Sequence, residues 1–361
     1  MRLLACVVLG LATAASAQFQ ILDGKTTASL RGIDAVSPQV AWASGSSGTV
    51  LLTTDGGANW KHCAVPPGGE KLDFRAVQGF DATTAFVMSS GKGDESRLYK
   101  TTDACLKWTL VMTNEEPEGF WDALRMWGPK AGFLVGDPVA GKMKIFSKLA
   151  SEADDLWDSY DYMERFSSVK GKGESAFAAS NSCLALGENR TVDGSWKTMW
   201  FGTGGKSGSW IRILRHRNGG DPELLESSVV EVAGFPKSQS GGIFSLAFRL
   251  DTEGVAVGGD YLKPDESTGT AAYTSDSGHT WNPATRPPHG YRSAVAYNPE
   301  AKTWISVGPN GTDVSKNHGQ DWDAVVPSKA DVQDADKNWN AISLPFVVGS
   351  KGRIGKLTAK F

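Results

Sequence analysis

Along this chain, short runs of apolar residues alternate with small and polar residues, and each run ends at a glycine or a turn. The runs come in pairs, as expected of two antiparallel strands joined by a tight turn. Seven such units follow one another about 40 to 60 residues apart, a period typical of four-stranded blades. The units are RGIDAVSPQVAWASGSSG, FRAVQGFDATTAFVMSSG, WDALRMWGPKAGFLVGD, SAFAASNSCLALG, FSLAFRLDTEGVAVGGD, YRSAVAYNPEAKTWISVG and WNAISLPFVVGSKG. The pattern predicts an all-β fold, a seven-bladed β-propeller.

The ends of the chain predict how the ring closes. The last unit supplies only about three strands, whereas FQILDG forms a lone strand-like piece before the first unit. We expect this N-terminal strand to complete the last blade, which would leave no open sheet edge. The uneven spacing is assigned to insertions at 149–172 and 188–237, and helix is expected at most as a turn within 151–166.

A second motif follows most of the units and is expected between the third and fourth strands of a blade. It has a hydroxyl residue, an acidic or amide residue two positions later, then glycine, which Cys105 replaces in the second copy, and then tryptophan. Four copies are TTDGGANW, TTDACLKW, TSDSGHTW and SKNHGQDW, and a degraded copy ends at Trp157. The motif residues are Thr53, Asp55, Gly57, Trp60, Thr101, Asp103, Trp108, Thr274, Asp276, Gly278, Trp281, Ser315, Asn317, Gly319 and Trp322.

These residue types suit a tight turn. Aspartate accepts hydrogen bonds from the backbone N–H groups of such a turn, and glycine adopts the positive φ that it requires. The hydroxyl bonds locally, and the tryptophan is expected to pack against the next sheet. We therefore interpret the aspartates as structural; catalysis and calcium binding are the alternatives.

The first residues resemble a targeting segment. Met1-Arg2, the apolar run LLACVVLGLATAA and the small residues Ala15 and Ala17 predict a signal peptide over residues 1–17. Residues 18–361 would then form a single propeller domain, exported to the periplasm or the extracellular space. Three cysteines remain after cleavage, and either Cys63 pairs with Cys105 or all three, with Cys183, are isolated thiols. Asn189 and Asn310 lie in glycosylation sequons.

Composition removes several classes of function. The 361 residues include 42 Gly and 13 Trp, which fits many short strands joined by turns. A formal net charge of −3 argues against a nucleic-acid partner. The five histidines show no metal-ligand spacing, and GTGGKSGS has no following helix and is interpreted as a hairpin turn. We expect a monomer without cofactor, metal or transmembrane segment.

The turn motifs resemble the Asp-box (BNR) repeats of sialidase-like propellers. More closely, the chain resembles the photosystem II stability and assembly factor family, as a non-photosynthetic bacterial relative. The matching phrases are FLVGDPV, MWFGTGG, GIFSLAF, GVAVGGDYLKPDE and GYRSAVAY with WISVGPNGTDVS, and they span nearly the whole mature chain. The resemblance implies a non-catalytic binding or assembly protein that recognises a protein partner outside the cytosol.

The alternative is a sialidase-like, glycan-processing hydrolase or a carbohydrate-binding propeller. Fold does not determine function, so the residues must be tested. The Arg-Ile-Pro motif expected of a sialidase is absent, and no tyrosine nucleophile can be assigned among Tyr261, Tyr273, Tyr291 and Tyr297. No catalytic residue is therefore predicted.

Aligning the first strands places one column of residues at the mouth of the ring: Arg31, Arg75, Asp122, Ser175, Phe244, Arg292 and Asn340. The loops after the second strands add Asp137, Asp260, Lys263, Asp265, Glu266 and Asn310. We predict a binding site for a protein or anionic peptide, made of Arg31, Arg75, Asp122, Asp137, Asp260, Lys263, Arg292, Asn310 and Asn340. Arginine forks match carboxylates, although these side chains could instead bond to carbonyl groups and fill the channel. An alignment error of one residue would turn a side chain to the other face of its strand.

Overall fold

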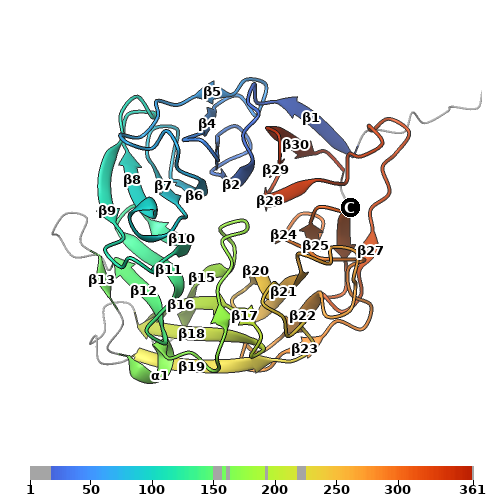
Figure 1. Ribbon diagram of the computed structural model, residues 1–361. Helices are drawn as coiled ribbons and strands as arrows, with labels where there is room; N and C mark the ends of the chain where they lie inside the picture. Colours follow the sequence, from blue (N-terminus) through green and yellow to red (C-terminus); the bar gives the residue numbers. More distant parts are fainter. Residues whose placement is uncertain (1–17, 149–156, 160–162, 192–193, 218–224, 360–361) are drawn as a thin grey trace, which may run out of the picture.

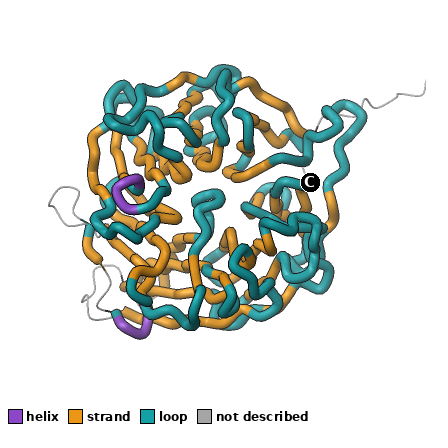
Figure 2. Tube along the Cα trace, in the orientation of Figure 1, coloured by secondary structure: helices purple, strands orange, loops and turns teal. Residues whose placement is uncertain are grey.

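The computed structural model describes residues 18–148, 157–159, 163–191, 194–217 and 225–359. Seven antiparallel sheets stand around a common centre (Figure 1), so the predicted all-β, seven-bladed β-propeller is confirmed. In this part of the chain, helix is limited to α1 (Glu164–Ser167) and the 3-10 turn η1 (Gly93–Glu95) (Figure 2). The predicted signal peptide and most of the degraded fifth copy lie outside the described residues.

The blades are numbered in chain order, and their strands run from the centre outward. Blade 1 holds β2 (Leu30–Ala35), β3 (Ala41–Gly45), β4 (Val50–Thr53) and β5 (Lys61–His62). Blade 2 holds β6 (Phe74–Gly79), β7 (Ala85–Ser89), β8 (Arg97–Thr101) and β9 (Thr109–Thr113). Blade 3 holds β10 (Trp121–Gly128), β11 (Ala131–Val139), β12 (Lys142–Lys148) and β13 (Asp158–Ser159). Blade 4 holds β15 (Leu184–Thr191), β16 (Gly194–Gly202), β18 (Ser209–Arg217) and β19 (Leu225–Val232).

The remaining strands complete the ring. Blade 5 holds β20 (Gly241–Arg249), β21 (Glu253–Asp260), β22 (Ala271–Thr274) and β23 (Asn282–Pro283). Two short strands, β14 (Glu174–Ser175) and β17 (Gly204–Gly205), pair beside it. Blade 6 holds β24 (Ala294–Asn298), β25 (Thr303–Val307), β26 (Thr312–Ser315) and β27 (Asp323–Ala324). Blade 7 holds β28 (Trp339–Ser343), β29 (Phe346–Gly349), β30 (Arg353–Leu357) and β1 (Phe19–Asp23).

The ring closes as the chain ends predict. Strand β1 pairs antiparallel with β30, from Phe19 opposite Leu357 to Asp23 opposite Arg353. The outermost strand of blade 7 therefore comes from the N-terminal end of the chain, whereas the other three strands of the blade come from the C-terminal end. Both carboxylate oxygens of Asp331 also accept hydrogen bonds from the Gln18 backbone N–H, at 2.9 and 3.1 Å.

Blade 4 departs from the prediction. Residues 188–237 were predicted as an insertion, but they hold the second half of β15 and all of β16, β18 and β19, which are the body of the blade. Ser175 was predicted in a first strand of a blade, but it lies in β14, and the innermost strand of blade 4 starts at Leu184. The prediction was wrong because small apolar residues buried in a loop have the same pattern as a strand.

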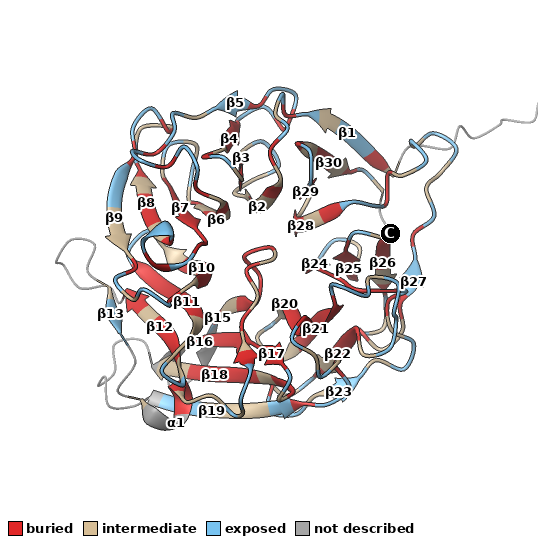
Figure 3. Cartoon of the chain, in the orientation of Figure 1, coloured by how far each residue is buried: buried red, intermediate tan, exposed pale blue. Residues whose placement is uncertain are grey.

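Residues 176–183, here called the central loop, fill the centre of the ring (Figure 1). Most of its residues are buried (Figure 3). Its side chains bond to the inner parts of three other blades: Ser180 Oγ donates to Ser293 O at 2.7 Å, Ser182 Oγ to Ser245 Oγ at 2.8 Å, and Asn181 Oδ1 accepts from Leu124 N at 2.7 Å. These bonds fix the loop between blades 3, 5 and 6.

The core lies between neighbouring sheets rather than within one. Trp42 of blade 1, for example, is fully buried against Phe74 and Val77 of blade 2. Successive side chains of a strand point to opposite faces of its sheet, and both faces are buried because a blade has a neighbour on each side. Both contacts of a blade are needed, so a ring left open would expose apolar surface.

The repeated turn motifs connect the third and fourth strands of blades 1, 2, 5 and 6, as expected. In the first copy the Thr53 hydroxyl donates to Asp55 at 2.9 Å and accepts from the Gly57 N–H at 2.9 Å. Asp55 in turn accepts from the side chain and backbone of Asn59, and these bonds lower the pKa of its carboxyl. Trp60 packs edge-on against Phe346, which belongs to the preceding blade, not the next one.

The buried hydroxyl of Thr53 is expected to matter more for stability than the exposed carboxylate beside it. Thr53→Val keeps the shape of the side chain but leaves the Gly57 N–H without its acceptor. We expect a loss of about 1–2 kcal/mol in the free energy of unfolding, measured by urea denaturation. Asp55→Asn serves as the comparison, and a larger loss in that variant would contradict this assignment.

A disulfide links two of the blades. Cys63 follows β5 of blade 1, and Cys105 occupies the glycine position of the turn in blade 2. Of the two alternatives left by the sequence, the structure has the Cys63–Cys105 bond, with Cys183 a buried free thiol. Cys105 adopts a φ of 58°, so it takes the left-handed conformation that glycine has in the intact copies.

Candidate functional site

A cavity of about 430 Å³ opens where the first strands begin, at the centre of the ring. We call it the mouth cavity. It is lined by the central loop, which leads into blade 4, and by residues in or next to the strands of blades 1, 2, 3, 5, 6 and 7. Five of the nine predicted site residues belong to its wall: Arg31, Arg75, Asp122, Asp137 and Asn340.

A repeated backbone irregularity brings four of these five residues, together with Phe244, to the cavity. In five blades the pairing of the first and second strands shifts at one residue: Arg31, Arg75, Asp122, Phe244 and Asn340. Such a bulge takes the side chain out of the regular alternation and re-aims it. The column aligned from the repeats therefore coincides with the bulges, and it converges because the ring closes.

One side of the mouth cavity is basic. The guanidinium of Arg75 donates to Asp73 at 2.8 Å and to the Ala178 carbonyl at 3.3 Å. Among the described residues, Arg31 has no hydrogen bond or ion pair of its own, and burial together with the charge of Arg75 lowers its pKa. Asn340 donates to the Leu30 carbonyl at 2.8 Å. Arg31 is therefore the cation best placed to receive an anionic group.

The blade 3 side carries two carboxyl groups. Asp137 accepts from Ser175 Oγ at 2.7 Å and from the Ala176 N–H at 2.9 Å. Asp122 is 1% exposed, and no described residue is hydrogen-bonded to its Oδ2 atom. Burial raises the pKa of both carboxyls, and the charge of Asp137 raises that of Asp122 further. Raised pKa values favour the neutral forms, so the positive charge of the arginines is only partly offset.

Aromatic rings form the rest of the wall. Phe177 of the central loop stacks on Phe244 with ring centroids 4.0 Å apart, and Tyr291 meets Phe244 edge-on at 4.8 Å. Tyr261 is 49% exposed at the opening. Phe120 packs beneath Arg75, whose guanidinium carbon lies 5.8 Å from the ring centroid. Of these rings only Phe244 was aligned at the mouth of the ring, and no site role was predicted for the others. Phe177 and Phe120 lie in loops, where the repeat gives no register.

Arg292 is a correction to the predicted site. Its side chain is fully buried, and it donates to Asp313 through both Nε, at 2.6 Å, and a terminal nitrogen. It also donates to Asn310 Oδ1 at 2.6 Å. Ser293, one residue later, lines the mouth cavity instead. The alignment of this blade was off by one residue, which places the arginine on the buried face of the chain.

The other three predicted residues support the rim and do not line the mouth cavity. Asp260 is buried and accepts from Ser238 Oγ at 2.7 Å and from the Leu262 N–H at 3.0 Å. Lys263 is exposed and pairs with Glu266 at 3.2 Å. Asn310 donates to the Pro264 carbonyl at 2.8 Å. Together they hold the 260–266 loop beside blade 6.

Asp34 lies near the end of β2 that is farther from the mouth cavity, and its ionisation makes the stability of the fold depend on pH. It accepts hydrogen bonds from the Gly79 N–H at 2.8 Å and from Gln78 Nε2 at 3.1 Å. Protein encloses its carboxyl on most sides, and this burial raises its pKa to about 6 despite the opposing charge of Arg125. The folded protein therefore holds this proton more tightly than the unfolded chain.

The contribution of Asp34 to stability is thus present at acid pH and lost as the pH rises from about 4 to about 6. Asp34→Asn keeps an acceptor oxygen and removes the ionisation. We expect it to raise the free energy of unfolding by about 2 kcal/mol near pH 7 and to change it little near pH 4. Denaturant unfolding across this range checks the result, with the exposed Asp23→Asn as control. An equal effect at both pH values would contradict it.

The fold and the cavity define the class: a seven-bladed β-propeller with an aromatic and partly basic cavity at the mouth of its ring. Similar solved structures include YCF48 bound to D1 peptide, with a TM-score of 0.58, 14% identity, and coverage of 96% of this chain and 98% of that one. They also include YCF48 from Cyanidioschyzon merolae, with a TM-score of 0.57, 15% identity, and coverage of 95% and 99%. The WD40 propeller domain of Doa1 has a TM-score of 0.56, 9% identity, and coverage of 94% and 96%. No protein-family model and no curated protein sequence matches the chain.

Two further observations concern the described residues alone. Their helices are all too short to span a bilayer. Nor do any three of their His, Cys, Asp and Glu side chains gather in a way that would hold a metal ion.

Proposed function

We propose that this protein is an exported, non-catalytic binding or assembly protein that takes an anionic peptide segment of a partner protein into its mouth cavity. The observation that carries the proposal is the environment of Arg31. Its guanidinium faces the mouth cavity and makes no hydrogen bond or ion pair with another described residue. Arginine binds carboxylates through two parallel hydrogen bonds, and the adjacent aromatic rings offer apolar surface to neighbouring peptide side chains.

Other features support the same proposal. The repeated turn motifs resemble those of Asp-box propellers, and the longer phrases are similar to the photosystem II stability and assembly factor family. One protein of similar fold was solved with a peptide bound. Export rests on the pattern of residues 1–17, and a disulfide between blades suits an oxidising compartment.

Arg31→Met is expected to weaken binding of an acidic peptide at least about tenfold, because a charge-assisted hydrogen bond contributes more than a neutral one. Peptides rich in Asp and Glu, with free or amidated C-termini, are screened first against the whole chain. The best ligand is then titrated by calorimetry at rising salt, which should weaken the wild-type complex.

The matched control for Arg31→Met is Arg286→Met, because Arg286 is exposed in a pair with Asp323. Unchanged affinity in Arg31→Met would overturn the role of Arg31. Turnover of sialosides or polysaccharides by the purified protein would instead favour the hydrolase alternative.

A further inference from the structure

A groove of about 780 Å³ adjoins the mouth cavity. The two hollows share four wall residues, which are Asp137, Ala176, Phe177 and Tyr261. We call the groove the lysine groove, because Lys172 and Lys206 lie in its wall. A ligand bound in the mouth cavity can therefore extend into the lysine groove along a continuous wall.

The lysine groove lies on the other side of the ring from Arg31. Its walls come from blade 3, from blade 4 with the segment that leads into it, and from blade 5. The innermost strands contact one another in chain order, so blade 1, which holds Arg31, stands opposite blades 4 and 5 (Figure 1). A peptide that reaches both Arg31 and the groove must cross the mouth, and it passes the rings of Phe177 and Tyr261 on the way.

The pairing of two short strands brings the lysines together. In β14 and β17, Glu174 lies opposite Gly205 in an antiparallel pair. Lys172 precedes β14 and Lys206 follows β17, so both lie at the same end of this pair. A Cβ atom placed on Gly173 would lie 3.6 Å from Lys206 Cβ, so the stem of Lys206 passes the residue next to Lys172. The two positive charges therefore act on one region of the groove.

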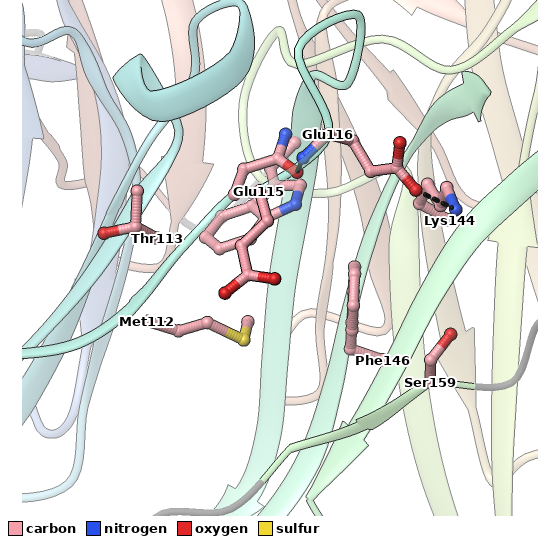
Figure 4. A pocket seen from close by; sticks show the side chains of 9 residues that line it. Met112, Thr113, Glu115, Glu116, Lys144, Phe146 and Ser159 are labelled. Carbon is pink, nitrogen blue, oxygen red and sulfur yellow. Dashed lines mark hydrogen bonds and ion pairs between the residues drawn. The ribbon is translucent and has the colours of Figure 1, made fainter.

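Both lysines are exposed, and neither makes a hydrogen bond or ion pair with another described residue. In the cleft between blades 2 and 3 (Figure 4), by contrast, the lysine in the wall, Lys144, is already paired with Glu116 at 2.9 Å. Lys172 and Lys206 are therefore the lysines best placed to receive an anionic group beside the mouth.

The carboxyl groups in the wall of the groove do not neutralise these lysines. Glu174 is buried and bound to Arg212 at 2.5 Å. Glu118 pairs with Lys92 at 2.8 Å. Burial raises the pKa of Asp137, which disfavours its ionised form. The lysine groove thus presents a positive surface, whose complement is an anionic ligand.

We propose that the segment bound by this protein carries two acidic residues on either side of an apolar one, with one carboxylate at Arg31 and the other in the lysine groove. This inference rests on the proposed function of the mouth cavity. The apolar residue packs on Phe177 and Tyr261, the two rings that both hollows share. Lysine is a point charge on a flexible stem, so the second carboxylate needs the right spacing but no fixed orientation.

The test compares acetylated and amidated Gly/Ser peptides that carry one Glu-Phe pair with peptides that carry a second Glu as well. The second Glu is placed about three to eight residues from the first, on either side. Affinity for the whole chain is measured by calorimetry. We expect the best spacing to raise the affinity about three- to tenfold, because each exposed ion pair strengthens binding only a few fold. Gln in place of the second Glu should remove this gain.

The double variant Lys172→Met/Lys206→Met is expected to lose the gain and to bind the single-Glu peptide like the wild type. Methionine keeps much of the aliphatic stem, and both positions are exposed, so the fold is retained. The matched control is Lys130→Met/Lys316→Met. It removes the same charge from exposed turns at the other end of the ring, and it should keep the gain.

The failure of this inference differs from the failure of the proposed function. If no acidic peptide binds the wild type, or if Arg31→Met binds every peptide equally well, the proposed function falls and the role of the groove falls with it. If the single-Glu peptide binds through Arg31 but a second Glu adds nothing at any spacing, only the role of the groove is overturned. It is also overturned if the gain is equal at all spacings or is lost in the control variant, because a general attraction of charges then explains it.

Discussion

Replacing Arg292 with methionine is expected to lower the free energy of unfolding by about 3–5 kcal/mol, although the sequence places this residue at an open binding surface. The guanidinium is fully buried and is the ion-pair partner of the buried Asp313. Against the effect of burial, the hydrogen bond with His289 and the charge of Arg292 hold the pKa of Asp313 below its usual value. Without Arg292, a buried carboxylate keeps only His289 as a side-chain partner among the described residues.

Thermal and urea denaturation measure this effect, and Arg286→Met is the control because its ion pair is exposed. The double variant Arg292→Met/Asp313→Leu should recover part of the loss, since removing both charges is less costly than leaving one unpaired. If Arg292→Met were as stable as the wild type, the buried pair would contribute nothing, and Arg292 could again be considered for binding.

Removing the disulfide is expected to have the second large effect. Cys63→Ser should cost about 2–4 kcal/mol, because the bond closes a long loop and restricts the unfolded chain. The two cysteines are 42 residues apart and belong to neighbouring blades. Cys63 is the better position to replace, because Cys105 has a positive φ and a substitution there would alter the turn as well.

Melting curves with and without a reductant check this prediction. A reductant should lower the melting temperature of the wild type toward that of Cys63→Ser and should leave the variant unchanged. The free thiol of Cys183 is buried in both proteins and provides the internal control. A wild type that is insensitive to reductant, although its bond is shown by mass spectrometry to be reduced, would contradict the assigned effect.

The repeat pattern was sufficient for the architecture because it reflects local physical requirements. Alternating apolar residues build strands, and the motif around Thr53 and Asp55 forms a turn through hydrogen bonds within a few residues. The incomplete last unit and the lone strand at Phe19–Asp23 likewise implied closure, which the pairing with β30 bears out. None of these features depends on knowing which blades face one another across the ring.

The repeats alone did not predict which residues line the mouth cavity. Arg31 and Arg292 are the same residue type at aligned positions, yet one faces the mouth and the other is buried beside Asp313. A shift of one residue separates these outcomes, because successive side chains point to opposite faces of a strand. The place of Phe177 was equally hidden, since the central loop has the composition of a strand but crosses the middle of the ring.

The sequence by itself therefore determined the seven blades and the turns between outer strands, which rest on contacts repeated at short range. It also implied the closure of the ring, because the last unit lacks one strand and a lone strand precedes the first unit. Only the tertiary structure decided which arginine meets solvent, where the central loop lies, and that Lys172 and Lys206 share the wall of one groove with Tyr261. These sites are made by residues far apart in the chain, and their geometry exists only after the sheets have packed against one another.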